Sequence, residues 1–176
     1  MPKKRVLPYI LLGLINNQAK LTGYQISQEF NNEIGEFWHA SHSQIYPELQ
    51  RMIDDGWVMS DEESSDSKST YYVITDKGND ALSEWLNEPL SEKDDLFSLK
   101  LYFVKDKHDS LMKKLIQQQL KINSAHYSHL LERKKLLFSK SSDIESSYGH
   151  YLILSSAIER ESNHIKWLND VLEELK

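Results

Sequence analysis

The sequence predicts a mainly helical protein in which an N-terminal part with one β-hairpin is followed by long helices. Only 6 Gly and 4 Pro occur among its 176 residues, and long segments space their apolar side chains three and four residues apart, as one helical face requires. The stretch 57–74 differs, because it is rich in β-branched and aromatic residues, which favour strands. We therefore predict two domains, a helical domain with a hairpin over 1–89 and a long-helix domain over 90–176.

The first two helices are indicated by spacing and caps. Leu7–Asn16 places its apolar residues on one face, and Gly13 inside it indicates close packing against a neighbour. Asn16–Leu21 is expected to be a polar turn. Thr22 is then the expected N-cap of a second helix, Gly23–Asn32.

A third helix ends before Gly56, the expected left-handed residue after its C-terminus. Its start is open, because Ser41 and Ser43 are both suitable caps. Pro47 is harmless within a first turn. With Ser41 as the cap one backbone hydrogen bond is lost, whereas a start nearer Gln44 avoids this loss.

The next segments predict a hairpin and a fourth helix. Trp57–Ser60 and Thr70–Ile74 have strand composition, and the polar tract Asp61–Ser69 between them is expected to form a long loop. Thr75 is the expected cap of the helix Asp76–Asn87.

The second half predicts three helical segments, Asp94–Val104, His108–Ser139 and Tyr148–Leu175, with a Ser-rich break over Ser139–Ser147. The last segment follows a heptad rhythm that is broken only by Glu161. Two helices of roughly 30 residues, each about 45 Å long, cannot bury their apolar stripes against one small domain. We therefore expect a homodimer, with the dimer contacts made by Leu154, Ile158, Ile165, Leu168 and Leu172.

Composition excludes several classes of protein. The chain has no Cys, which excludes disulfides, thiolate zinc sites and cysteine nucleophiles. No apolar run reaches the ~18 residues of a membrane span, and no cleavage site follows Val6–Ile15, so a cytoplasmic location is expected. Residues 1–88 have a net charge of −7 and residues 89–176 a net charge of +1. The acidic half argues against non-specific binding of nucleic acid.

The order of three helices, a hairpin and a helix is typical of the winged helix-turn-helix, whose third helix enters the DNA major groove. That helix begins with polar and aromatic residues and has no acid before Glu48. Gln44 suits a bidentate contact with adenine, and hydroxyl groups suit phosphates. The alternative is that the serines only cap the helix and Tyr46 only packs. The residues expected at DNA are Ser41, His42, Ser43, Gln44 and Tyr46.

Several stretches are recognisable. Leu21–Ile26 (LTGYQI) and Gly35–Leu49 (GEFWHASHSQIYPEL) resemble the DNA-recognition region of PadR-family transcriptional repressors. Tyr148–Leu152 (YGHYL), Ala157–Glu161 (AIERE) and Trp167-Leu168 resemble the members of that family that respond to phenolic acids. The resemblance therefore covers nearly the whole chain.

This resemblance implies a homodimeric repressor of a phenolic acid decarboxylase gene that binds double-stranded operator DNA. It also implies release by hydroxycinnamic acids such as p-coumaric and ferulic acid, with dimerisation through the C-terminal helices. Within the matching stretches and the loop that follows, Tyr24 and Lys68 are further candidates for DNA contacts.

The loop of the hairpin departs from the family pattern, in which basic residues face the DNA backbone. Asp61–Lys68 contains four acids and one Lys, so its tip would repel phosphate. Either only the Lys68 side approaches DNA or the loop contributes little. The basic segment Lys3–Arg5 offers replacement charge as an arm, the alternative being a solvated terminus.

The histidines suggest an effector site and no metal site. His39 and His42, like His126 and His129, are spaced i, i+3, but no third ligand with suitable spacing follows. His150 lies between aromatic residues, so His150, Tyr148 and Tyr151 suit a phenolic carboxylate; the alternative is a His buried between helices. No constellation of catalytic residues supports an enzyme, and no cofactor is expected. The second hypothesis is a winged-helix module that binds another protein through its acidic surface.

Overall fold

The computed structural model describes residues 5–36, 38–61, 70–91 and 96–176. The chain forms two compact units. The N-terminal unit is the chain up to Glu88 together with Ser98–Phe103, and the C-terminal unit is Pro89–Phe97 with Val104–Lys176. The mainly helical class that the sequence predicts is confirmed, whereas the division after residue 89 stays a prediction.

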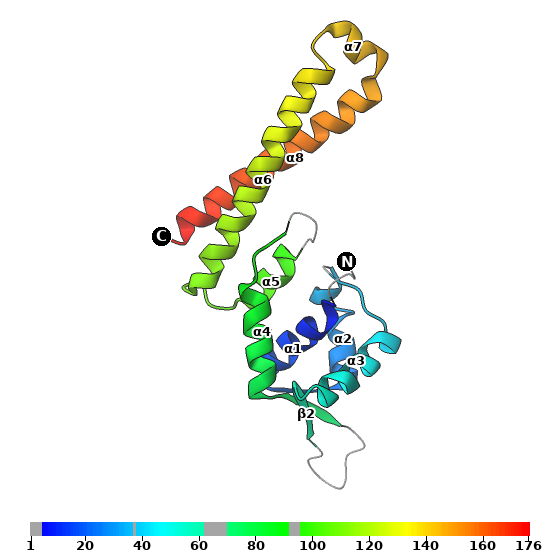
Figure 1. Ribbon diagram of the computed structural model, residues 1–176, viewed down its shortest axis with the longest axis vertical. Coiled ribbons are helices and arrows are strands. Elements are labelled where there is room, and N and C mark those ends of the chain that lie inside the picture. Colours follow the sequence, from blue (N-terminus) through cyan, green and yellow to red (C-terminus); the bar gives the residue numbers. More distant parts are fainter. Residues whose placement is uncertain (1–4, 37, 62–69, 92–95) are drawn as a thin grey trace. The chain divides into compact units, whose positions relative to one another are not determined.

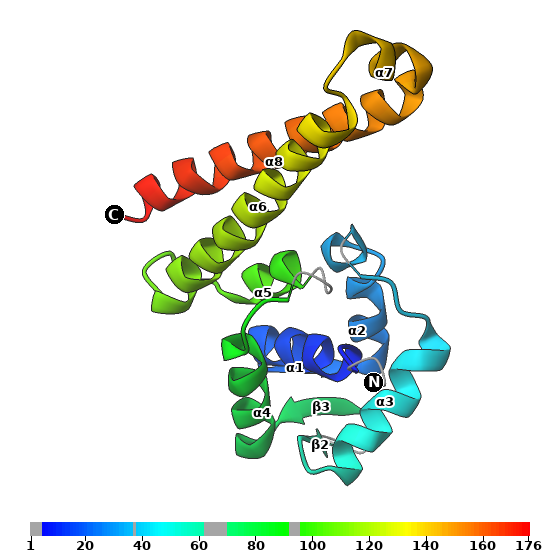
Figure 2. The same cartoon turned by 45° about the horizontal axis from the view of Figure 1, so that its top comes forward.

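Helix α1, Leu7–Gln18, is the centre of the N-terminal unit. Helices α2, α3 and α4 pack around it (Figure 2). A helix that is apolar on nearly all sides belongs in a core. The side chains of α1 that are at most 2% exposed are Ile10, Leu11, Leu12, Leu14 and Ile15. The expectation for Gly13 is confirmed, because a Cβ there would lie 2.4 Å from the ring of Phe103.

The expected polar turn over Asn16–Leu21 was wrong. It contains the end of α1 and the start of strand β1, Lys20–Thr22, which pairs antiparallel with β3, Tyr71–Ile74. Leu21, 2% exposed, is the only apolar residue in this strand. Three residues are too short to show strand alternation, so only the distant partner strand defines β1.

The predicted hairpin is confirmed as β2, Val58–Asp61, paired antiparallel with β3. The sheet order is β1-β3-β2, so β3 is the central strand. Ser60 lies opposite Tyr72. Most of the predicted loop, 62–69 with Lys68, lies outside the described residues.

Helix α2, Gly23–Glu29, begins at the predicted cap: Gln25 N donates to Thr22 Oγ1 at 3.2 Å. It ends three residues before the predicted Asn32, and a 3-10 turn, Glu33–Glu36, follows. The chain folds back tightly there, since a Cβ on Gly35 would lie 2.4 Å from the carbonyl oxygen of Phe30.

Helix α3, His42–Asp54, has Ser41 as its N-cap and is followed by Gly56 at a φ of 72°. The positive φ confirms the predicted left-handed residue. Helix α4, Asp76–Asn87, begins at Thr75, whose Oγ1 accepts from Gly78 N at 3.1 Å. Figure 1 shows these elements together with the short helix α5, Phe97–Phe103, which begins later than the predicted Asp94.

The C-terminal unit is a hairpin of two long helices, α6, Ser110–Leu137, and α8, Tyr148–Glu174. The helices lie side by side and run in opposite directions (Figures 1 and 2). The predicted Ser-rich break contains a short helix, α7, Ser141–Ser146. An Asp143 oxygen accepts from Lys140 N at 2.9 Å, which supplies a local start signal for α7.

Candidate DNA-binding and effector sites

The first turn of α3 presents polar side chains to solvent. Ser41, His42, Ser43 and Gln44 are all exposed, while Ile45 is buried behind them. Gln44 Oε1 accepts from Ser41 N at 3.0 Å, and the hydroxyls of Ser41 and Ser43 are 2.8 Å apart. The candidate base-reading side chain therefore also caps its own helix.

The choice of cap that the sequence left open is settled in favour of Ser41. Pro47 is then the sixth helical residue, so the amide that would donate to the carbonyl of Ser43 is missing. The helix begins early enough to expose one full turn of polar residues.

Tyr46 both packs and remains accessible. Its side chain is 43% exposed, and its ring stacks on His42 with the ring centroids 6.2 Å apart. A Cβ on Gly23, the first residue of α2, would lie 2.6 Å from the Tyr46 ring. Burial, and to a lesser extent the nearby Tyr46 hydroxyl, raise the pKa of Tyr72 on β3. Tyr46 thus lies where α2, α3 and the sheet meet.

Tyr24, 65% exposed, follows Gly23 in the first turn of α2. The contact between Gly23 and Tyr46 brings the beginnings of α2 and α3 together. Both helices therefore contribute to one exposed face, which carries hydroxyl and amide groups. Such groups are hydrogen-bond donors and acceptors for phosphate and base edges.

Basic residues near this face are only partly described. Lys3, Lys4 and Lys68 lie outside the described residues. Arg5 is described, and its guanidinium pairs with the carboxylate of Glu48 on α3. Sequence reasoning missed this pair, because nothing local links two residues 43 positions apart.

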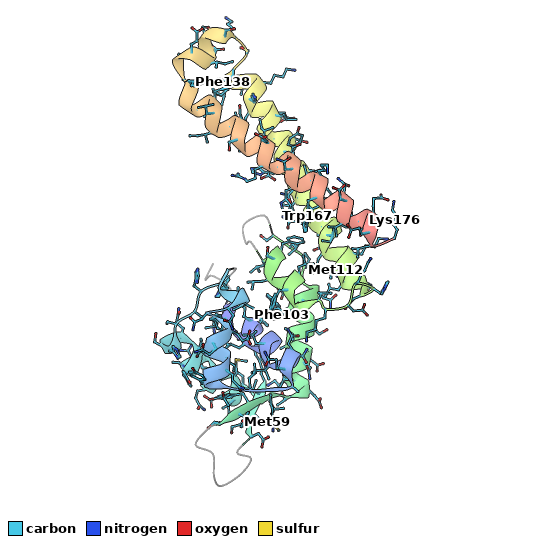
Figure 3. All side chains as sticks on the ribbon, turned by 180° about the vertical axis from the view of Figure 1, so that it is seen from behind. Met59, Phe103, Met112, Phe138, Trp167 and Lys176 are labelled. Atoms are coloured by element: carbon cyan, nitrogen blue, oxygen red, sulfur yellow. The ribbon has the colours of Figure 1, made fainter. Side chains whose placement is uncertain are left out.

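In the C-terminal unit, two of the predicted effector residues, His150 and Tyr151, lie against Phe138, the residue after α6. Figure 3 labels Phe138 near the end of the α6–α8 hairpin that holds α7. The Phe138 ring lies edge-on to His150 and to Tyr151, with centroid distances of 5.4 and 5.5 Å. Tyr148 stacks on Tyr151 at 6.2 Å. Lys134 Nζ lies 4.7 Å from the centre of the Tyr151 ring, so the cluster includes a cation.

This aromatic cluster is open to solvent within one chain. His150 is exposed and Tyr148 is 57% exposed. His150 is therefore not the buried residue of the alternative interpretation. Sequence reasoning missed Phe138 and Lys134; their i, i+4 spacing at the end of a long helix, just before the break, was the available signal.

The predicted dimerisation stripe of α8 is partly used inside the chain. Leu154 is 6% exposed and Leu168 is 0% exposed, and both lie in the α6–α8 hairpin. Their side chains are therefore already buried without a second copy. Ile158, Ile165 and Leu172 are half-buried. The dimerisation role of the whole stripe stays a prediction.

Glu161, which interrupts the heptad rhythm, is buried at 7% exposure, and side chains of α6 contact both of its carboxylate oxygens. Asn123 Nδ2 donates to Glu161 Oε2 at 2.6 Å, and His126 Nδ1 lies 3.2 Å from Glu161 Oε1. Gln119 Nε2 donates to Asn123 Oδ1 at 2.8 Å. The polar residue in the stripe thus has polar partners on the facing helix, as a buried carboxylate requires.

Two further properties concern the described residues. None of the helices formed by these residues is both long and apolar enough to cross a membrane. Within the same part of the chain, no three His, Asp or Glu side chains converge as metal ligands would.

Known proteins match the chain along nearly its whole length. The family model described as transcriptional regulator PadR-like matches residues 11–84, and the one described as virulence activator alpha C-terminus matches 93–176. The negative transcriptional regulator PadR of Bacillus subtilis is 36% identical over an alignment of 176 positions that covers 96% of each protein.

Crystal structures of Bacillus subtilis PadR also match. The complex with operator DNA has a TM-score of 0.46 at 35% identity and covers 98% of this chain and 100% of that one. The complex with p-coumaric acid has a TM-score of 0.45 at 36% identity and covers 97% and 99%. From the identity to the Bacillus subtilis regulator over nearly the whole chain, it follows that this protein belongs to the PadR-like family of transcriptional regulators.

Proposed function

We propose that this chain is a homodimeric repressor of a phenolic acid decarboxylase gene, and that hydroxycinnamic acids such as p-coumarate release it from operator DNA. The proposal rests first on the 36% identity to a negative transcriptional regulator across 96% of both proteins. In this proposal residues 1–89 bind DNA and residues 90–176 dimerise and respond to the effector.

The observation that carries DNA binding is the exposed first turn of α3. Ser41, Ser43 and Gln44 offer hydroxyl and amide groups at a helix N-terminus, where the dipole favours phosphate. One such helix per protomer fits two half-sites in successive major grooves of a pseudopalindrome.

The aromatic cluster of the C-terminal unit supports the effector part. Phe138 and Tyr151 offer ring contacts, and His150 offers a hydrogen-bond donor. Lys134 adds a positive charge beside Tyr151. This charge can pair with the carboxylate of the effector, which is ionised at neutral pH. An effector acts only if it binds the DNA-incompetent state better; a 100-fold loss of DNA affinity needs about 2.7 kcal/mol of coupling.

The test is a mobility-shift titration with the promoters of the chain's own gene and of any neighbouring decarboxylase gene. We expect a specific complex that p-coumarate dissociates and that benzoate, which lacks the phenolic acrylate, leaves intact. His150→Ala should bind the promoter like wild type but need a higher p-coumarate concentration for release. His129→Ala, an exposed His of α6, is the matched control and should respond like wild type.

Three results would count against parts of the proposal. If no promoter gives a specific complex, the chain is better described as a protein-interaction module. If the complex persists at saturating p-coumarate, the proposal that hydroxycinnamic acids are the effectors is wrong. Release of His150→Ala at the wild-type concentration places the effector elsewhere.

A further inference from the structure

Three charged side chains meet beside α3, and the proposed function leaves them unused. Glu48, in the middle of α3, is 6% exposed. Arg5 Nη2 donates to Glu48 Oε1, and Arg51 Nη1 lies 3.6 Å from Glu48 Oε2. Arg5 comes from the segment before α1 and Arg51 from the next turn of α3. We call these three residues the Arg–Glu–Arg cluster.

The cluster carries an excess of positive charge. A buried carboxylate is stable only when it is paired, and one guanidinium suffices to neutralise it. Here two guanidiniums share one carboxylate, which leaves a formal charge of +1. The side chains of Arg5 and Arg51 are 57% and 61% exposed. Each guanidinium has five N–H donors, so both keep donors that face solvent.

The cluster lies on the same stripe of α3 as Gln44. Gln44, Glu48 and Arg51 are spaced i, i+4, i+7, which places them along one side of the helix. Arg51 is about 10 Å further along the axis than Gln44 at ~1.5 Å per residue. The major groove is roughly 12 Å wide. If Gln44 contacts bases in the groove, Arg51 is therefore at a suitable distance to reach the phosphate backbone at the edge of the groove.

The N-terminal unit has few other cations for this task. Among its described residues the remaining Lys side chains are those of Lys20, Lys77 and Lys100. Lys100 is buried at 1% exposure, and its Nζ donates to the carbonyl of Glu88 at 2.7 Å. Lys20 Nζ lies over the ring of Tyr71, and Lys77 Nζ donates to the carbonyl of Asp55, just after α3 ends. Glu48 is the only acid on α3 before Asp54. The positive charge of the described recognition region is thus concentrated at the Arg–Glu–Arg cluster.

We propose that Arg5 and Arg51 bind phosphates of the DNA backbone beside the groove, and that Glu48 is a positioning residue that holds both guanidiniums in place. This inference rests on the proposed function, because it assumes that α3 enters DNA. It explains how an acidic N-terminal unit obtains backbone contacts. Guanidinium groups suit phosphate because their planar donors match its oxygens.

The experiment measures the salt dependence of DNA binding by fluorescence anisotropy, with a labelled duplex from the promoter that gives the specific complex. Each phosphate contact contributes about 0.9 to the slope of log K against log salt concentration. Arg5→Gln and Arg51→Gln should each lower the slope by about that amount. If binding converges at 1 M salt, this equals an affinity loss of about 8-fold at 0.1 M salt for each variant.

A second background separates DNA contact from folding. Removing one Arg from the native chain also weakens the pairing of a buried carboxylate. The same Arg variants are therefore made with Glu48→Gln, which is nearly isosteric and has no charge to neutralise. Circular dichroism checks that each variant is folded. We expect Arg5→Gln and Arg51→Gln to lower the slope in this background as well.

Lys77→Gln is the matched control, since it removes the same charge from the same unit beyond the other end of α3. Its slope should equal that of wild type. The inference is overturned if, in the Glu48→Gln background, the Arg variants keep the slope of Glu48→Gln alone. It is also overturned if Lys77→Gln lowers the wild-type slope as much as the Arg variants do. Wild-type protein that binds no promoter defeats the proposed function and this inference together, whereas unchanged Arg variants of a binding protein defeat only the inference.

Discussion

At the scale of single residues, the expected DNA-binding face depends on the small space between Gly23 and Tyr46. Any side chain on Gly23 meets the Tyr46 ring, which lies against the beginning of α2 and stacks on His42. A Cβ there would lie within 2.6 to 3.1 Å of the ring and its hydroxyl. Because Gly23 on α2 has no side chain, the Tyr46 ring on α3 can lie against it, and this contact sets the position of the Tyr46 hydroxyl.

Gly23→Ala should weaken promoter binding while the free energy of unfolding changes little. The clash falls on the far end of a side chain that is 43% exposed, so Tyr46 can turn away but loses its position. Anisotropy titration and urea denaturation measure the two effects. Gly149→Ala is the control, because its Cβ would have nothing within 4 Å. Equal promoter affinity for Gly23→Ala and wild type would contradict a DNA role for Tyr46.

Gln44 has two roles that one substitution separates. Gln44→Glu keeps an oxygen that accepts from Ser41 N, and its charge suits the first turn of a helix. It loses the amide donor that adenine requires and adds a charge that phosphate repels. We expect unchanged thermal stability. The free energy of promoter binding should become less favourable by about 1–3 kcal/mol. A variant that binds the promoter like wild type would remove Gln44 from the base-reading set.

At the scale of elements, the α6–α8 hairpin combines an apolar seam with one buried polar site. Leu154 and Leu168 lie two heptads apart on α8, and Glu161 is midway between them. Asn123 and His126 on α6 hold both oxygens of this carboxylate. Polar pairs of this kind cost stability but can define helix register. The contacts of Asn123 and His126 with Glu161 therefore favour one register of α6 against α8.

Asn123→Leu should destabilise the protein by about 1–3 kcal/mol, because Glu161 loses a hydrogen bond inside the seam. Asn123→Leu combined with Glu161→Leu should recover this loss or exceed it, because no buried charge remains. Guanidinium denaturation of wild type, both single variants and the double variant measures the coupling. Additive effects would show that the two side chains do not depend on each other.

At the scale of the whole molecule, the C-terminal unit exposes apolar side chains on α8 that the hairpin does not cover. Leu152 is 49% exposed and Ile153 is 72% exposed. Leu168, in contrast, is fully buried within the chain. Charging Leu168 would break the hairpin itself, so the exposed pair gives a cleaner test of the proposed homodimer.

Leu152→Glu with Ile153→Glu should give a folded monomer with much weaker promoter binding, because a dimer reads two half-sites together. Light scattering and circular dichroism measure mass and folding. Ser162→Glu adds a charge at an exposed site of the same helix, away from the face of Leu152 and Ile153, and should remain dimeric. A double variant that keeps the mass of a dimer would show that the interface lies on another face.

By itself the sequence determined the features that depend on local signals. Helical periodicity located α1, α4, α6 and α8, Thr22 and Thr75 marked caps, and Gly56 marked the end of α3. The exposed turn from Ser41 to Gln44 and the grouping of Tyr148, His150 and Tyr151 also followed from adjacent residues. Motifs of this length carry the family resemblance as well, because their residues are close in the chain.

Only the tertiary structure decided the features that join distant residues. β1 exists because β3 offers it hydrogen bonds, and no signal within its three residues predicts it. Arg5 and Glu48 are 43 residues apart, and Asn123 and Glu161 are 38 apart. The partner of a buried charge is chosen by which elements pack together. Periodicity shows that a helical face is buried, but the packing of the whole chain determines what buries it.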